Sequence, residues 1–152
     1  MISFQASEHV MFDRMSGNRS RGQSCHVEVV FAYPNEYTVG ICSLGYQVVW
    51  AALSKIPNVS VARLFTDAME SLPQNPDLLG FSLSWELDYK GLFSQLGFVG
   101  VPRRAAQRTA SDPLVFGGGP VLTANPEPFA DFFDVILLGD GEDVLPAFLE
   151  RY

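Results

Sequence analysis

The stretch VEVVFAYPNEYTVGICSLGYQVVWAALSKIP, residues 27–57, decides the fold class. Every second residue from Val27 to Phe31 is apolar, which is the pattern of a β-strand, and Pro34 then ends the strand in a turn. Over residues 38–56 the apolar side chains recur at helical spacing until another proline follows. The pattern predicts a strand followed by a helix, the first unit of an α/β fold.

The alternation of strands and helices continues along the chain. Four further apolar runs predict strands, at residues 59–65, 78–84, 113–116 and 134–139. Amphipathic stretches predict helices or helical turns at residues 85–96, 129–133 and 144–149, and the Pro, Asn and Asp of residues 66–77 predict an irregular crossover. Nearly continuous apolar runs in the last three strands are typical of parallel strands covered on both faces. The fold class is therefore doubly wound α/β with five strands.

Length and composition indicate one globular domain. The chain has 152 residues, 47% of them apolar, and we expect residues 25–152 to form the domain and residues 1–24 a loose leader. A formal net charge of -7 opposes nucleic-acid binding, which depends on cations that displace counterions. Apolar runs are much shorter than the roughly 20 residues that span a bilayer. We expect a domain that binds neither nucleic acid nor membrane.

Two cysteines, Cys25 and Cys42, are too few for a disulfide framework and are consistent with a cytoplasmic location. They also lack the close spacing of a zinc or iron-sulfur site. This chain is therefore not expected to hold an iron-sulfur cluster by itself.

In an open parallel sheet, ligands bind in the crevice beyond the carboxyl ends of the strands. Four loops of this chain follow predicted strand ends, at residues 34–40, 82–86, 117–120 and 139–142. Any ligand site is expected at these loops.

These loops also carry a family resemblance. The segments PNEYTVGICSLGYQ, GFSLSWELDY, VFGGGPVLTANPEPFADFFD and LLGDGE occur in an order and at separations that resemble the cobalamin-binding-like domains that precede a radical SAM (S-adenosylmethionine) catalytic domain. The resemblance covers residues 27–150 and implies a flavodoxin-like sheet with the strand order 2-1-3-4-5. It also implies that cobalamin is a candidate cofactor of this domain.

The first loop departs from the family pattern at its central position. Cobalamin domains that ligate cobalt through imidazole carry D-x-H-x-x-G after the first strand, whereas this chain has Asn35, Tyr37 and Gly40 at the Asp, His and Gly positions. A neutral phenol is a poor cobalt ligand, whereas imidazole is a good one. His9 in the leader and His26 at the start of the first strand cannot readily replace it. We therefore expect no protein ligand on the lower face of cobalt.

The other three loops supply the remaining candidate cofactor-binding residues. The resemblance assigns Ser82 and Ser84 to contacts with the nucleotide tail, and the glycine run Gly117, Gly118 and Gly119 to close backbone approach by the ligand. The resemblance places Gly139 and Glu142 in the segment that leads toward the radical SAM domain. Each has a structural alternative: Ser84 as a helix cap, the glycines as a tight turn, and Glu142 as a charge near a helix dipole.

The resemblance implies a larger enzyme of which this chain is one module. A 4Fe-4S cluster and S-adenosylmethionine would belong to a downstream radical SAM domain, which is the expected partner. By itself this chain is not expected to be catalytic. The alternative is a module with the same fold that binds no cofactor and acts in docking or in substrate presentation.

Two other classes of α/β domain are excluded, because this chain lacks the residues that each of them requires. A phosphoacceptor receiver domain needs acidic residues after the first and third strands and Lys after the fifth, where this chain has Asn35, Ser82 and Gly139. A dinucleotide-binding domain needs G-x-G-x-x-G after the first strand, and Gly40 and Gly45 do not have that spacing.

Overall fold

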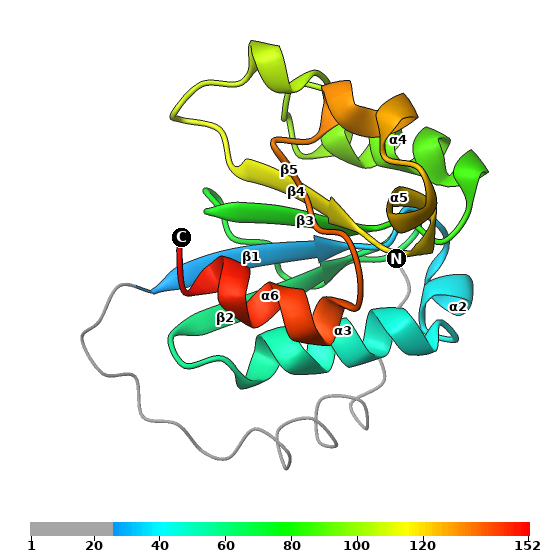
Figure 1. Ribbon diagram of the computed structural model, residues 1–152. Coiled ribbons are helices and arrows are strands. Elements are labelled where there is room, and N and C mark those ends of the chain that lie inside the picture. The colour runs from blue at the N-terminus through cyan, green and yellow to red at the C-terminus, as the bar shows by residue number, and fades with distance from the viewer. Residues whose placement is uncertain (1–25) are drawn as a thin grey trace.

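The computed structural model describes residues 26–152, so the predicted leader, His9 and Cys25 lie outside the described residues. Five parallel strands form one sheet in the order β2-β1-β3-β4-β5, which confirms the predicted fold class and strand order (Figure 1). The strands are β1 (Val27–Ala32), β2 (Val59–Leu64), β3 (Leu78–Ser82), β4 (Leu114–Gly118) and β5 (Val135–Ile136).

Helices cover both faces of this sheet (Figure 1). One face carries α2 (Tyr37–Gly40), α3 (Leu44–Lys55) and α6 (Gly141–Leu149), and the other carries α4 (Tyr89–Phe98) and α5 (Pro120–Ala124). Three short 3-10 turns, η1 (Glu86–Asp88), η2 (Ala105–Gln107) and η3 (Glu127–Phe132), complete the connections. The fold therefore has three layers, with the sheet in the middle.

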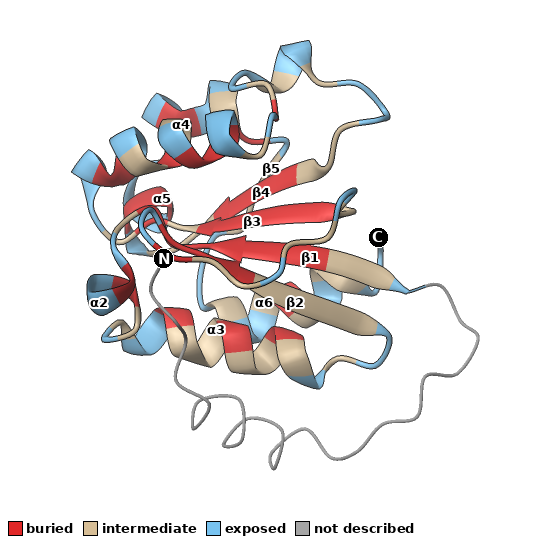
Figure 2. Ribbon diagram, turned by 180° about the vertical axis from the view of Figure 1, so that it is seen from behind, coloured by how far each residue is buried: buried red, intermediate tan, exposed pale blue. Residues whose placement is uncertain are grey.

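Alternating side chains of the strands divide the core into two apolar clusters. Along β1, Val29 and Phe31 pack toward α3, whereas Val30 and Ala32 pack toward α4. All four are at most 2% exposed, because helices cover both faces of the central strands (Figure 2). Burial on both faces explains why these strands are nearly continuous apolar runs.

The structure differs from the predicted elements in three places. The helix predicted over residues 38–56 is broken at residues 41–43, because the Ser43 hydroxyl accepts a hydrogen bond from the Tyr46 amide (3.4 Å) and starts a new helix. The strand predicted over residues 134–139 is regular only at Val135–Ile136, at the sheet edge. The pattern also missed α5, whereas residues 66–77 contain no helix, as predicted.

An ion pair between the buried Arg108 side chain and the exposed Asp134 holds the long connection between α4 and β4 against the sheet edge. The Arg108 guanidinium donates hydrogen bonds to Asp134 (2.8 Å) and to the carbonyls of Phe132 (2.6 Å) and Pro102 (3.0 Å). Asp134 also accepts from the Val115 amide of β4 (2.7 Å). These contacts fix the amino-terminal start of β4, the end opposite the glycine run.

Candidate functional site

A cleft of about 600 Å³ lies at the carboxyl ends of β1, β3 and β4, on the face covered by α3 and α6. This volume is within the range of small-molecule sites, roughly 300–1,000 Å³. Its walls come from three of the four predicted loops and from the first turns of α3, α5 and α6. The lining residues used below are Phe31, Tyr46, Ser82, Ser84, Phe116, Gly118, Gly119, Thr123, Gly139, Asp140 and Glu142.

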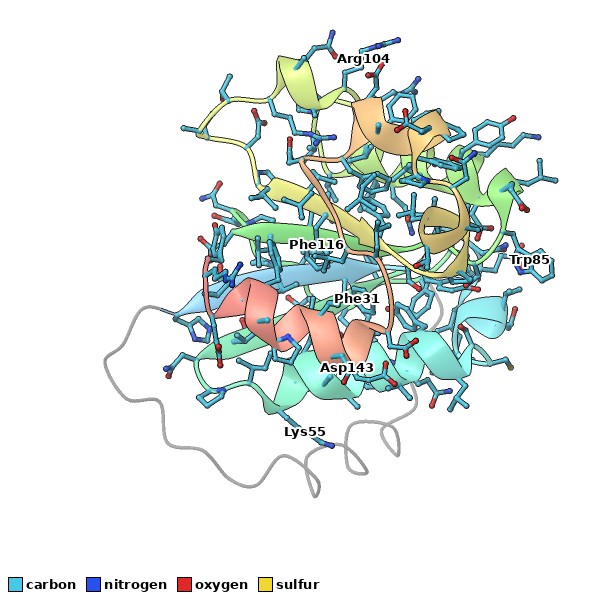
Figure 3. The ribbon with its side chains drawn as sticks, viewed as in Figure 1. Phe31, Lys55, Trp85, Arg104, Phe116 and Asp143 are labelled. Atoms are coloured by element: carbon cyan, nitrogen blue, oxygen red, sulfur yellow. The ribbon has the colours of Figure 1, made fainter. Side chains whose placement is uncertain are left out.

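Aromatic rings form the floor of the cleft. The rings of Phe31 and Tyr46 are stacked, with centroids 4.7 Å apart and planes 5° apart, and the Tyr46 hydroxyl donates to the Phe31 carbonyl (3.0 Å). Phe116 lies over Gly80, where an added Cβ would be 2.2 Å from its ring, and it also packs against Phe148. Figure 3 labels Phe31 and Phe116 at the sheet, beside α6. These contacts hold the three rings, each at most 2% exposed, beneath the cleft.

The glycine run has a different role at each position. A Cβ on Gly117 would lie 2.7 Å from Leu122 and from Phe133, so this glycine serves packing on the opposite face. Gly119 has φ +112°, and its Cβ would lie 2.5 Å from the Leu83 carbonyl oxygen, so only glycine fits. A Cβ on Gly118 would lie 3.6 Å from its nearest neighbour, and Gly118 lines the cleft. Gly118 is therefore the glycine beside which the cleft wall leaves room.

The loop after β5 closes the other side of the cleft. Gly139 has φ +101°, and its amide donates to the Thr123 hydroxyl (3.2 Å). Beyond it, Asp140 and Glu142 are exposed at the start of α6. None of the described residues that line the cleft is Lys or Arg, so the rim is acidic.

The first loop lies outside the cleft lining. Tyr37 is only 8% exposed, its ring packs edge to face on Phe65 with centroids 5.3 Å apart, and its amide donates to Asp67 (2.7 Å). A Cβ on Gly40 would lie 2.4 Å from the Phe65 ring. Asn35 donates to Asp88 (3.4 Å) and accepts from the Glu36 amide. Asn35, Tyr37 and Gly40 are therefore packing and turn residues in this structure.

Asp88 connects the first loop to the loop after β3. It is 4% exposed and accepts hydrogen bonds from the amides of Ser84 (3.3 Å) and Trp85 (3.0 Å), as well as from Asn35. The N-cap of η1 is Trp85, whose amide donates to Asp88, and not Ser84, the residue that the sequence offered as a helix cap. The sequence pattern missed its connecting role because Asn35 is 53 residues away.

Residues 26–152 contain neither a metal-binding cluster nor a membrane-spanning helix. Within that range no group of three or more His, Cys, Asp and Glu is placed to hold a metal ion, and no helix is long and apolar enough to cross a membrane. His26 contacts the Ser60 hydroxyl (3.1 Å) at the amino ends of β1 and β2, at the sheet edge opposite the cleft.

Residues 29–152 match the family model described as "Radical SAM proteins, N-terminal". This chain belongs to that family. Among relatives of this radical SAM N-terminal domain, an uncharacterized protein of Methanocaldococcus jannaschii is 28% identical over 125 residues. That match covers 81% of this chain and 26% of the relative, so the chain spans about a quarter of the relative's length.

The fold of the radical SAM N-terminal domain is similar to that of a novel cobalamin-binding protein from Desulfitobacterium hafniense, whose crystal structure superimposes with a TM-score of 0.53. The match covers 83% of this chain and 59% of the other, at 15% identity. The similarity therefore establishes a shared fold.

Proposed function

We propose that the cleft of this radical SAM N-terminal domain holds the nucleotide tail of cobalamin, without a protein ligand to cobalt. The observation that carries the proposal is a cleft of about 600 Å³ with an aromatic floor and a glycine in its wall at Gly118. The base of the tail would lie over the aromatic floor, where Phe31, Tyr46 and Phe116 are each at most 2% exposed before a ligand binds.

The residues around the floor suit the rest of the tail. Ser82 and Ser84 offer hydroxyls to ribose or amide groups, and Gly118 lets the ligand approach the β4 backbone. Gly119, Gly139 and Glu142 complete the proposed binding set. The acidic rim disfavours polyphosphate nucleotides, because each added phosphate meets Asp140 and Glu142, whereas the tail carries a single phosphodiester.

The first loop does not fit the role of cobalt ligand. Tyr37 packs on Phe65, and neither Tyr37 nor Asn35 lines the cleft. Binding would therefore depend on enclosure of the tail. When bound, cobalamin would supply a cobalt centre to the full-length protein, and the 4Fe-4S cluster and S-adenosylmethionine would belong to the downstream radical SAM domain.

An observation beside the cleft favours a second candidate function, a docking module without cofactor. Trp85 is 65% exposed and Leu87 is 72% exposed, and Figure 3 shows Trp85 pointing away from the domain at the carboxyl edge of the sheet. Large exposed apolar side chains beside a cleft are typical of a surface that another domain covers. The downstream radical SAM domain is the proposed partner in both candidates.

Uptake of hydroxocobalamin separates the two candidates. Equilibrium dialysis of the purified chain is expected to show binding at about one ligand per chain, and Gly118→Val should weaken it at least about tenfold, equal to ~1.4 kcal/mol. Gly97→Val is the matched control, because Gly97 in α4 also has open space at Cβ but lies outside the cleft. Circular dichroism verifies folding of both variants. Absence of uptake by the wild-type chain would favour the docking module.

A further inference from the structure

The aromatic floor of the cleft is almost completely covered in this structure. Phe31, Tyr46 and Phe116 all line the cleft, yet each of them is at most 2% exposed. Leu145 of α6 lines the cleft beside them, is 1% exposed and belongs to the same apolar cluster. A ligand that contacts the faces of these rings therefore needs the chain that covers them to move.

The loop that leads into α6, residues 138–140, has few contacts with the rest of the domain. The last amide before it, that of Leu137, donates to a carbonyl of β4 (2.8 Å). Within residues 26–152, the first and third amides of the loop have no acceptor, and the middle one, that of Gly139, donates to the Thr123 hydroxyl (3.2 Å). An added Cβ on Gly139 would have no neighbour closer than 4.0 Å. The loop is therefore free to change its backbone conformation.

A proline interrupts α6 directly after Leu145. Because Pro146 has no N–H, α6 lacks the hydrogen bond that would join this position to the Glu142 carbonyl. Beyond the proline the helix is anchored, since Phe148 packs on Phe116 with ring centroids 5.4 Å apart. The first turn of α6 is thus joined less firmly to the second half of the helix than in an unbroken helix.

The first turn of α6 lies on α3, and the two helices are side by side in Figure 1. An added Cβ on Gly141 would lie 2.6 Å from a methyl group of Val49 and 3.9 Å from the Val49 Cβ. Within the turn, the amides of Asp143 and Val144 both donate to the Asp140 carbonyl (3.1 and 3.2 Å). These bonds join the loop to the first turn, so that the two can move as one unit.

From these contacts we infer that residues 138–145 form a lid over the aromatic floor, hinged at Gly139 and Pro146. The lid is closed in this structure and opens to admit a planar ligand, which replaces Leu145 against the rings. The inference rests on the proposed function, because it specifies how the base of the nucleotide tail reaches the floor. Apparent affinity for the ligand is then reduced by the fraction of molecules in which the lid is open.

Thiol labelling measures the opening without any ligand. In a chain with Cys25→Ser and Cys42→Ser, Leu145→Cys places one thiol under the lid, and Leu53→Cys, in α3 and 0% exposed, is the matched control. Iodoacetamide is expected to label Leu145→Cys at least about a hundredfold faster than Leu53→Cys, because local opening is more frequent than global unfolding. Pro146→Ala should slow the labelling of Leu145→Cys about fivefold, as one regained hydrogen bond does. Circular dichroism verifies that each variant is folded.

A disulfide that locks the lid provides the second arm. Val49→Cys with Gly141→Cys, in the same background, joins positions whose Cβ atoms would lie 3.9 Å apart, within the roughly 3.5–4.5 Å of disulfides. The oxidised chain should bind cyanocobalamin at least about tenfold more weakly than the reduced chain, because the open state is removed. Val49→Ser with Gly141→Ser cannot form the bond and should bind equally under both conditions. Cyanocobalamin is used because free thiols attack it less readily than hydroxocobalamin.

Two results would overturn the lid. One is an equal labelling rate for Leu145→Cys and Leu53→Cys, and the other is equal uptake by the oxidised and reduced forms of the disulfide variant. Absence of uptake by the wild-type chain would contradict the proposed function, and the labelling rates would then decide by themselves whether the lid opens.

Discussion

The first loop, residues 34–40, and the glycine run, residues 117–119, lie at the same edge of the sheet but have opposite surroundings. The first loop turns its central ring inward onto Phe65. The glycine run leaves space beside Gly118, where the nearest atom to an added Cβ would be 3.6 Å away. The same position at a strand end can thus serve packing or enclose a ligand, depending on which side chains from other elements reach it.

The comparison predicts separable effects. Changes in the first loop should alter stability and leave cobalamin uptake unchanged, whereas changes that project into the cleft should alter uptake and leave stability unchanged. Four variants test whether effects on stability and on uptake are separate.

Gly119→Ala is expected to have the largest effect on stability, about 3 kcal/mol or more, because of its positive φ and the 2.5 Å approach to the Leu83 carbonyl oxygen. Gly118→Ala should cost less than about 0.5 kcal/mol, because its Cβ would be in ordinary van der Waals contact, 3.6 Å from the Leu137 carbonyl oxygen. Urea denaturation of both variants measures the difference. Equal losses would contradict the distinction within the glycine run.

Asp88→Ala removes the carboxylate that connects the first loop to the loop after β3. We expect a loss of about 2 kcal/mol, because the amides of Ser84 and Trp85 lose their acceptor. Glu86→Ala, on the same turn but exposed, is the control and should change stability by less than about 0.5 kcal/mol. Chemical denaturation compares them, and similar values would mean that the connection contributes little.

Tyr37→His tests the ligand position directly. Because the ring packs on Phe65 outside the cleft lining, the variant should lose roughly 1–2 kcal/mol of stability. It should not gain a pH-dependent visible spectrum with hydroxocobalamin. Tyr89→His, which places an imidazole on the surface of α4, is the spectral control. A transition specific to Tyr37→His would show that this position reaches cobalt and would break the comparison.

Gly97→Ala should have the smallest effect and the opposite sign. Its Cβ would meet no atom within 4 Å, so the higher helix propensity of alanine should stabilise α4 by roughly 0.5–1 kcal/mol. Thermal unfolding measures the gain, and dialysis should show unchanged cobalamin uptake. A destabilised variant would indicate that α4 needs glycine there for a reason outside the static packing.

Local patterns were sufficient to predict the fold class. The alternation of apolar residues in strands, the helical spacing and the prolines that end elements are all properties of short segments. The strand order came from the family resemblance, and the loops that border the cleft were predicted from their position after strands, as parallel sheets require. The length and continuity of each helix and strand were less predictable. The helix over residues 38–56 is broken at Ser43, and the last strand, at one edge of the sheet, is regular only at Val135–Ile136.

The direction of side chains at the site depended on contacts between distant segments. Tyr37 turns inward because its ring packs on Phe65 and its amide donates to Asp67, which is 30 residues away. Gln95 is held by carbonyls 62 and 31 residues away. A spacing pattern places a residue at a strand end, but only the packing of the complete domain decides whether its side chain faces a ligand or a neighbouring ring.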